Sequence, residues 1–295
     1  MIKKSAIVRV KGGFGNQLFQ IMFANELVQR GLDVTVSTKN FKRATKKGIT
    51  KNINGINLER NLILPLDYFS FDETKDSVLY LYEFAEKLMN FKVIEFLVRF
   101  FKLESFRSFN DSTDTKIEYA KHNLFTGYWQ DIDLFIKNKD FILNSISNNE
   151  KIKKGLDIKP IPGSTLLHVR RKDYVNMGED LSLNFYSEAL DYAARHIKNF
   201  SYTIFTDDYE WVSKKQVFID AVDIKSPVLD MDDTIQTFSE MLKFENFIVG
   251  NSTFSLIPGI LRETSTSKII IAEPWFKNSN PIKNFPKHWI KINNL

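Results

Sequence analysis

The chain has 295 residues, of which 43% are hydrophobic and 14% aromatic, and it carries a net charge of +5. This length and composition predict a packed globular protein with one very large core or two cores, and they exclude an intrinsically disordered chain. The sequence contains no cysteine, which excludes disulfides, thiolate metal sites and a cysteine nucleophile and agrees with a reducing compartment. The modest positive charge comes with no nucleic-acid-binding motif and no long run of like charge, so we expect no nucleic-acid partner.

The first predicted element is a buried strand at residues 6–10. Lys3 and Lys4 precede it, but no long apolar segment follows them, so the N-terminus does not have the pattern of a signal peptide. No uninterrupted apolar run in the chain approaches the length of a membrane-spanning helix. We therefore expect a cytoplasmic protein with at most a peripheral membrane contact.

A glycine-rich loop follows the strand and leads into an apolar helix predicted at residues 18–30. The loop contains Gly12, Gly13, Gly15, Asn16 and Gln17. It has neither the lysine and hydroxyl of a P-loop nor the third glycine of the dinucleotide-binding motif. The two amides can donate to sugar hydroxyls, whereas the alternative is a capped helix after a tight turn, which the loop alone favours.

The rest of the N-terminal half is less regular. Residues 32–37 predict a strand and residues 39–61 predict loops. Residues 84–106 predict a basic amphipathic helix that packs inside the domain or lies on a membrane surface, internal packing being favoured. A strand at 123–126 precedes a turn at 127–130 with two aromatic side chains, which suits either stacking on a sugar ring or ordinary core packing.

A polar, lysine-rich segment at 148–159, followed by two prolines and a glycine, predicts a linker. We accordingly expect domains at 1–155 and 156–295. In the second domain, strands predicted at 165–169, 202–205, 247–249 and 269–271 alternate with helices, including one at 185–197. This alternation predicts an α/β fold with a parallel, doubly wound sheet.

Charged and polar residues follow three of these strands. His168, Arg170 and Arg171 end the first, Asp207 and Asp208 follow the second. The third strand is followed by Asn251, Ser252 and Thr253. Because the carboxyl ends of parallel strands share one edge of a sheet, we expect these residues to line a single crevice.

The composition of this crevice favours a phosphorylated ligand. The planar guanidinium of arginine binds phosphate through two parallel N–H donors. The backbone N–H groups after a helix cap such as Ser252 form a second anion-binding position. The alternative is a solvated strand end in which Asp173 neutralises Arg170 and Arg171. Asp207 and Asp208 suit a divalent ion, but we favour their holding the arginines or accepting from a ribose or base.

Four segments together resemble the motifs of the bacterial α-1,2-fucosyltransferase family. They are GGFGNQ at 12–17, HVRRKDYV at 168–175, FTDDYEW at 205–211 and NSTFS at 251–255. The resemblance implies a GT-B arrangement, in which two Rossmann-like domains face each other across a cleft. It also implies metal-independent, inverting transfer of L-fucose from GDP-fucose to the 2-hydroxyl of a galactose-containing acceptor glycan, which can be lipid-linked. The C-terminal domain would bind GDP-fucose, and the N-terminal domain would face the acceptor.

The resemblance also implies roles for individual residues. Arg170 would bind the donor's β-phosphate, with His168 and Arg171 beside it. The sequence singles out no general base, and Asp173 is a candidate only from its place beside the arginines. The expected catalytic residues are Arg170, His168 and Asp173. The expected donor-binding residues are Gly13, Gly15, Asn16, Gln17, Arg171, Asp207, Asp208, Glu240, Asn251, Ser252, Thr253 and Ser255. Among these, Glu240 would read the guanine edge, and Ser252 to Ser255 would close over the diphosphate. No metal ligand and no cofactor is expected.

Two departures from the family pattern keep other functions open. Residues 256–259 read LIPG where the family has paired tryptophans, and Lys172 replaces a small residue. The remaining alternatives are another GDP-sugar transferase, a different fucosyl linkage, or a non-catalytic sugar- or nucleotide-binding protein.

Overall fold

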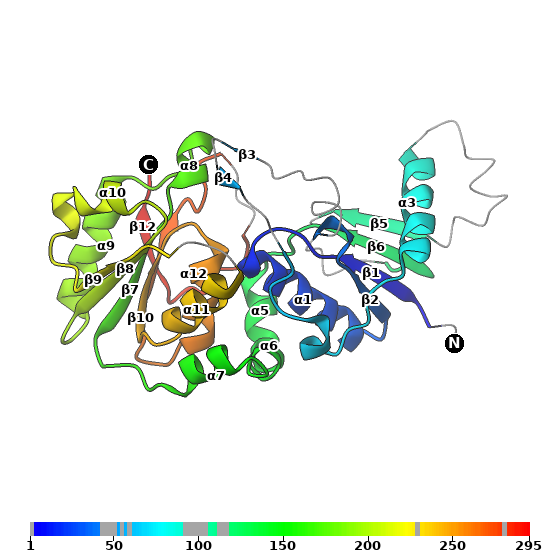
Figure 1. The fold of residues 1–295 in the computed structure, drawn as a ribbon, viewed down its shortest axis with the longest axis horizontal. Coiled ribbons are helices and arrows are strands. Elements are labelled where there is room, and N and C mark those ends of the chain that lie inside the picture. Colours follow the sequence, from blue (N-terminus) through cyan, green and yellow to red (C-terminus); the bar gives the residue numbers. More distant parts are fainter. Residues whose placement is uncertain are drawn as a thin grey trace. The chain divides into compact units, whose positions relative to one another are not determined.

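The computed structural model describes residues 3–41, 52–53, 56–57, 61–90, 106–110, 118–227, 231–278 and 282–295. The chain divides into two units, Met1–Ile142 and Leu143–Leu295. Each unit contains a parallel β-sheet with helices packed against it (Figure 1). The predicted α/β fold with two Rossmann-like units is confirmed, although the division falls between Ile142 and Leu143 rather than after residue 155.

The first unit is built on a four-stranded sheet in the order β2-β1-β6-β5. All neighbouring strands in this sheet are parallel. The strands are β1 (Ser5–Arg9), β2 (Asp33–Ser37), β5 (Phe106–Asn110) and β6 (His122–Thr126), and a separate antiparallel pair joins β3 (Asn52–Ile53) to β4 (Ile56–Asn57). The helices are α1 (Phe14–Gln29), the 3-10 helix η1 (Leu66–Phe69), α3 (Asp76–Asn90), α5 (Ile132–Lys137) and α6 (Lys139–Ile146), which spans the division.

Helices cover the sheet of the first unit because its strands are apolar. Ile7 of β1 and Leu124 of β6 form a buried cluster with Leu79 and Ala85 of α3. Helix α1 is buried along most of its length, as expected for a helix that is apolar all round. This packing leaves the carboxyl ends of β1, β2 and β6 to carry polar loops.

The second unit contains a six-stranded sheet in the order β12-β11-β10-β7-β8-β9. All of its strand pairs are parallel. The strands are β7 (Ser164–Val169), β8 (Ser201–Thr206), β9 (Asp223–Lys225), β10 (Asn246–Val249), β11 (Ile269–Glu273) and β12 (Ile290–Asn293). The helices are α7 (Glu150–Asp157), α8 (Lys172–Met177), α9 (Leu183–His196), α10 (Tyr209–Ser213), η3 (Gln216–Phe218), α11 (Met231–Met241) and α12 (Thr253–Arg262).

This strand order is that of a dinucleotide-binding Rossmann sheet. From β7 the chain moves outward through β8 and β9, and then returns to place β10 on the other side of β7. The point where the order reverses, between β7 and β10, is where open α/β sheets bind ligands outside the carboxyl ends of their strands. The predicted arginine and hydroxyl motifs follow these two strands.

The predicted linker is wrong, because most of it forms helix α7. The side chain of Asn149 caps this helix by accepting hydrogen bonds from the backbone N–H groups of Lys151 and Ile152, at 3.1 and 3.2 Å. Ile152 is fully buried, and the Ser239 hydroxyl of α11 donates to the Lys151 carbonyl at 2.5 Å. The lysines that made the segment look like a linker belong to the solvent-facing side of a short amphipathic helix.

The predicted basic helix at 84–106 also changes. Helix α3 begins earlier, at Asp76, and residues 91–105 lie outside the described residues. Phe106, the predicted end of the helix, is the first residue of β5. Within the described ranges, no helix is both long enough and apolar enough to span a bilayer.

Candidate functional site

The site of the second unit is built where the ends of β7 and β10 meet. A Cβ atom on Gly250 would lie 2.7 Å from the carbonyl oxygen of His168, so only glycine allows this close approach of the two backbones. The contact brings the start of α12 next to β7. There the Ser255 hydroxyl lies 2.8 Å from Nδ1 of His168.

His168 is a neutral, buried residue. Burial lowers its pKa to about 3, and the charge of Arg170 lowers it in the same direction. The Ser255 hydroxyl also lies 3.2 Å from the Ser252 carbonyl, so it links the His168 ring to the first turn of α12. A neutral ring held in this way orients the first turn of α12, while the catalytic role of His168 stays a prediction.

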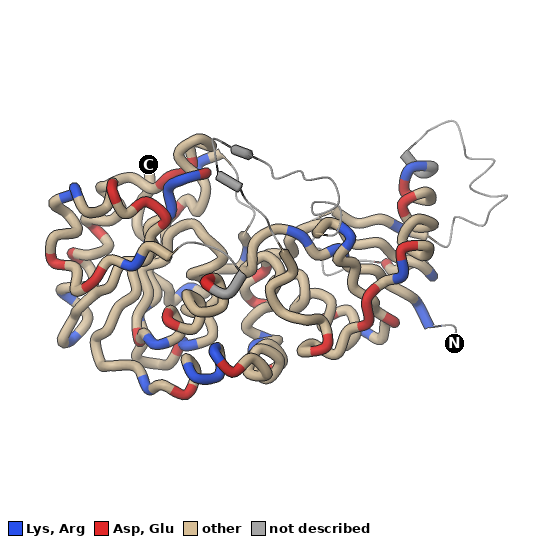
Figure 2. Tube along the Cα trace, viewed as in Figure 1, with Lys and Arg blue, Asp and Glu red and all other residues tan. Residues whose placement is uncertain are grey.

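Arg170 is held by two carboxylates. Its guanidinium nitrogens lie 2.7 Å from Oδ1 of Asp173 and 2.9 Å from Oδ2 of Asp207. The other Asp207 oxygen accepts from the backbone N–H of Arg171 at 2.8 Å. Basic and acidic segments accordingly lie together at the carboxyl ends of β7 and β8 (Figure 2). A guanidinium has more N–H donors than these contacts use, so Arg170 is oriented and retains donors for a ligand.

Arg171 has a structural environment. Its side chain lies 3.2 Å from Asp208 and 3.1 Å from Asp180, and its guanidinium carbon lies 3.7 Å from the centre of the Trp211 ring. Asp208 also caps α10 by accepting from the backbone N–H of Trp211 at 3.1 Å. Of the roles weighed for the two aspartates, these contacts match the holding of the arginines. These contacts give Arg171 a bracing role in the cluster.

The start of α12 supplies backbone donors. Ser252 is the N-cap residue, and its hydroxyl accepts from the backbone N–H of Phe254 at 3.3 Å. Asn251 before it is 1% exposed, donates to the Glu179 carbonyl at 2.5 Å, and accepts from the Tyr174 hydroxyl at 3.0 Å through its own carbonyl. Its side-chain oxygen is buried without a hydrogen-bond partner within the described part of the chain. Thr253 is the first residue of the helix, whose N-terminus favours an anion.

The three predicted loops therefore meet at one edge of the sheet. Tyr174 links the arginine segment to Asn251, and Asp207 links it to the end of β8. Residues 256–259, where the family pattern has paired tryptophans, are buried within α12. This departure from the family pattern therefore affects residues that pack α12 against its sheet.

Glu179 is a part of the site that the sequence did not reveal. This buried residue accepts hydrogen bonds from the backbone N–H groups of Lys277 and Asn278 at 2.6 and 3.0 Å, and from the Asn278 side chain at 2.9 Å. Because the Glu179 carbonyl accepts from the Asn251 side chain, Glu179 joins the loop after β11 to Asn251. A glutamate in a loop gives no local signal for partners almost a hundred positions away.

The glycine loop of the first unit is organised by its own side chains. The Gln17 amide donates to the carbonyls of Gly12 and Asn61 and accepts from the backbone N–H of Ile63, at 3.0, 2.8 and 3.0 Å. These backbone contacts give the Gln17 amide a structural role, and its donor-binding role stays a prediction. Gly13 is the N-cap of α1, and Gly15 is buried within that helix.

Asn16 and Gln20 connect this loop to the turn after β6. Asn16 accepts from the Gln130 side chain at 2.8 Å, and Gln20, which the sequence did not single out, donates to the Gly127 carbonyl at 3.0 Å. Trp129 in the same turn is 1% exposed and stacks on Phe23, so it packs in the core and not on a sugar.

Glu240 does not have a free carboxylate for a guanine base. One of its oxygens pairs with Lys225 at 3.3 Å, and the other pairs with Lys243. Burial raises its pKa, but the two lysines outweigh burial and hold the pKa below its ordinary value. Its base-reading role stays a prediction, and in this arrangement Glu240 joins β9 to the end of α11.

Comparison with known proteins decides the family. The model of glycosyl transferase family 11 matches residues 5–293, which include all four motif segments. The chain belongs to glycosyl transferase family 11. The predicted resemblance to the fucosyltransferases is confirmed, and this family 11 member is a glycosyltransferase of the fucosyltransferase type.

Individual relatives are distant. An α-1,2-colitosyltransferase of Escherichia coli is 23% identical over 97% of this chain and 98% of its own length. Among solved structures, the NodZ α-1,6-fucosyltransferase co-crystallised with GDP is 14% identical with a TM-score of 0.43, over 88% of this chain and 93% of that one. A family 9 glycosyltransferase from Veillonella parvula is 11% identical with a TM-score of 0.42, over 99% of this chain and 86% of that one.

Proposed function

We propose that this family 11 enzyme transfers L-fucose from GDP-fucose to the 2-hydroxyl of a galactose-type acceptor, with inversion. One observation carries the proposal. At the reversal point of the second sheet, Arg170 is fixed by Asp173 and Asp207 in the cluster of loops that includes the N-terminus of α12. A guanidinium and a helix N-terminus together suit a diphosphate.

The reaction breaks the bond between C1 of fucose and the β-phosphate oxygen of GDP. An acceptor hydroxyl oxygen bonds to C1 from the opposite face and loses its proton to a base, while GDP takes the electron pair of the broken bond. Negative charge therefore grows on the β-phosphate in the transition state. Donors already oriented at that phosphate lower the barrier, because they act where the transition state differs most from the bound substrate.

In this assignment Arg170 acts on the developing charge, and the residues around it have supporting roles. Asp173 and Asp207 orient its guanidinium, His168 and Ser255 orient α12, and Arg171 with Trp211 braces the cluster. The pairing of Asp173 with Arg170 favours a holding role for this carboxylate over that of the catalytic base.

Colitose is a second candidate for the transferred sugar. The Escherichia coli relative is named for the same α-1,2 linkage with colitose, which is fucose without its 3-hydroxyl. The two donors share the GDP moiety, so the diphosphate contacts argued above serve both. The sugar pocket must then decide between them.

The test is a donor and acceptor panel. The full-length protein is incubated with GDP-fucose, GDP-colitose or GDP-mannose, each with and without a β-galactoside, and the product linkage is determined by NMR. We expect GDP release from GDP-fucose only when the galactoside is present, and an α-1,2 linkage in the product. Preferential use of GDP-colitose would transfer the proposal to that sugar, and binding of GDP without any transfer would indicate a non-catalytic binding protein.

A further inference from the structure

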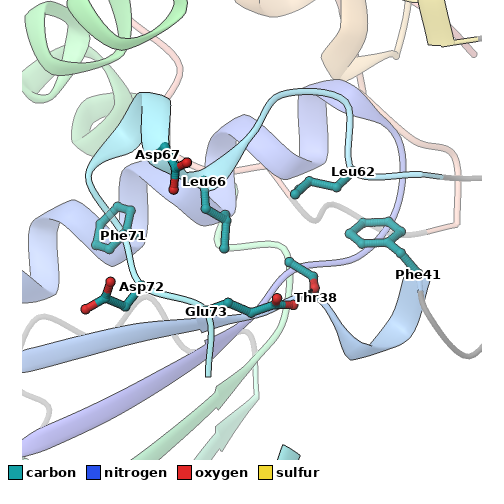
Figure 3. A pocket seen from close by; sticks show the side chains of 8 residues that line it. All are labelled: Thr38, Phe41, Leu62, Leu66, Asp67, Phe71, Asp72 and Glu73. Carbon is teal, nitrogen blue, oxygen red and sulfur yellow. Dashed lines mark hydrogen bonds between the residues drawn. The ribbon is translucent and has the colours of Figure 1, made fainter. Parts of the chain in front are cut away.

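The first unit contains a cavity of about 470 Å³ next to the carboxyl end of β2 (Figure 3). Its volume lies within the range of ligand-binding pockets. It is lined by Thr38, Phe41, Leu62, Leu66, Asp67, Phe71, Asp72 and Glu73. These residues come from the turn after β2 and from the segment that contains η1.

Hydrogen bonds fix the walls of this cavity. The backbone N–H of Val36 in β2 donates to the backbone carbonyl of Asp72 at 3.0 Å, and the backbone N–H of Thr74 donates to the Val36 carbonyl at 2.8 Å. At the other end of the same segment, the Gln17 amide holds Asn61 and Ile63. Hydrogen bonds within the first unit therefore hold the cavity walls in place. Gln17 of the glycine-loop motif positions the wall that contains Leu62.

The lining combines apolar surface with negative charge. Figure 3 shows Leu62 and Phe41 on one side, Asp67 and Phe71 on the other, and the Glu73 carboxylate turned toward the Thr38 hydroxyl, to which it is hydrogen-bonded. Among the lining residues that the structure describes, none is a lysine or an arginine. Within the described residues, the side chains of Asp67 and Asp72 make no ion pair or hydrogen bond, so these carboxylates are open to a ligand's donors.

We infer that this cavity holds a neutral sugar residue of the acceptor glycan and discriminates against sugars that carry a carboxylate. A pyranose has an apolar C–H face, which suits phenylalanine and leucine, and a rim of hydroxyl donors, which suits carboxylate acceptors. A carboxylated sugar would place a further negative charge beside three acidic side chains. A bound metal ion is the less suitable occupant, because no acidic or histidine cluster able to hold one occurs among the described residues. The inference rests on the proposed function, since it names the class of acceptor.

The test compares two small sugars that differ only at C6. Methyl β-galactopyranoside and methyl β-galactopyranosiduronate are titrated against the full-length protein saturated with GDP, and binding is followed by saturation-transfer NMR. We expect the wild type to bind the neutral sugar at least about tenfold more tightly, because like charges repel across a shared site. In the double variant Asp67→Asn/Asp72→Asn, the preference should fall to within about threefold, since the amides still accept hydrogen bonds but carry no charge.

Asp133→Asn is the matched control, because it removes one exposed carboxylate of the first unit on α5, outside the cavity. Asp133→Asn should retain the wild-type preference, and the thermal unfolding of all variants should be similar. An unchanged preference in the double variant, or a wild type that binds both sugars equally or neither, would overturn the inference. GDP binding is titrated separately. A protein without affinity for GDP argues against the proposed function, whereas the preference between the two sugars tests the inference about the cavity.

Discussion

Arg170 illustrates how a single residue is prepared for chemistry. Two carboxylates at 2.7 and 2.9 Å orient its guanidinium, so in the proposed reaction no reorganisation is needed as charge develops on the leaving phosphate. We therefore expect Arg170→Ala to lower kcat by about a hundredfold or more at saturating donor.

Arg195→Ala provides the control for this substitution. Arg195 is an exposed arginine of α9 whose side chain contacts only its own helix among the described contacts, with a 3.1 Å bond to Asp191. Its loss should leave turnover unchanged, and circular dichroism should show both variants folded. Near-normal turnover of a folded Arg170→Ala protein would contradict the assignment.

His168 makes stability depend on pH. Its pKa is about 3 in the folded protein, against about 6.5 for an unfolded histidine. Between these values the unfolded chain binds a proton that the folded protein does not, so the free energy of unfolding falls as pH falls through this window. The contribution of neutral His168 to the free energy of unfolding is fully present above about pH 6.5. Below that pH it decreases by up to about 1.4 kcal/mol per pH unit.

Urea unfolding at pH 7 and pH 5 measures this effect against His168→Asn, which keeps a polar side chain but has no titrating ring. The wild type should lose more stability than the variant over this interval. Parallel losses in the two proteins would show that His168 is protonated in the folded state as easily as in the unfolded chain.

At the scale of elements, the junction of β7 with β10 depends on one glycine. A methyl group on Gly250 would meet the His168 carbonyl at 2.7 Å, and neither backbone can move without shifting a strand. We expect Gly250→Ala to cost about 1–3 kcal/mol in unfolding free energy, as overpacking does, and to weaken GDP binding because α12 starts just beyond this position.

Arg195→Ala serves again as the stability control, since its exposed side chain contacts only its own helix within the described part of the chain. Chemical unfolding and a GDP titration measure the two effects. Wild-type stability together with wild-type GDP affinity in Gly250→Ala would show that the close approach of the two strands is not required.

Elements also show where local patterns mislead. The lysines around α7 are typical of a linker, yet Ile152 and the cap of Asn149 make the segment a helix packed on α11. The amphipathic pattern is present in the sequence, but a helix of this length is stable only when a neighbouring surface buries its apolar side.

At the scale of the whole molecule, a metal-independent reaction is expected. In the reaction proposed above, Arg170 and the N-terminus of α12 supply positive charge for the leaving diphosphate, so we expect no requirement for a divalent ion. Transfer by the intact protein should therefore be equal in EDTA and in untreated buffer. A loss of activity in EDTA that Mg²⁺ or Mn²⁺ restores would contradict this.

The sequence by itself determined the α/β class, the main strands and the residues that follow them, because an apolar run and the polar cluster after it are local features. The meeting of the three loops of the second unit also followed, since parallel strands place their carboxyl ends at one edge. Only the tertiary structure decided the partners: Gln17 binds backbone 44 positions away, and Glu179 binds Lys277, 98 positions away. Such contacts depend on which loops the sheet brings together, and no local pattern encodes them. The sequence therefore predicted neither the partners of Gln17 and Glu240 nor the places of Gly250 and Glu179 in the candidate site.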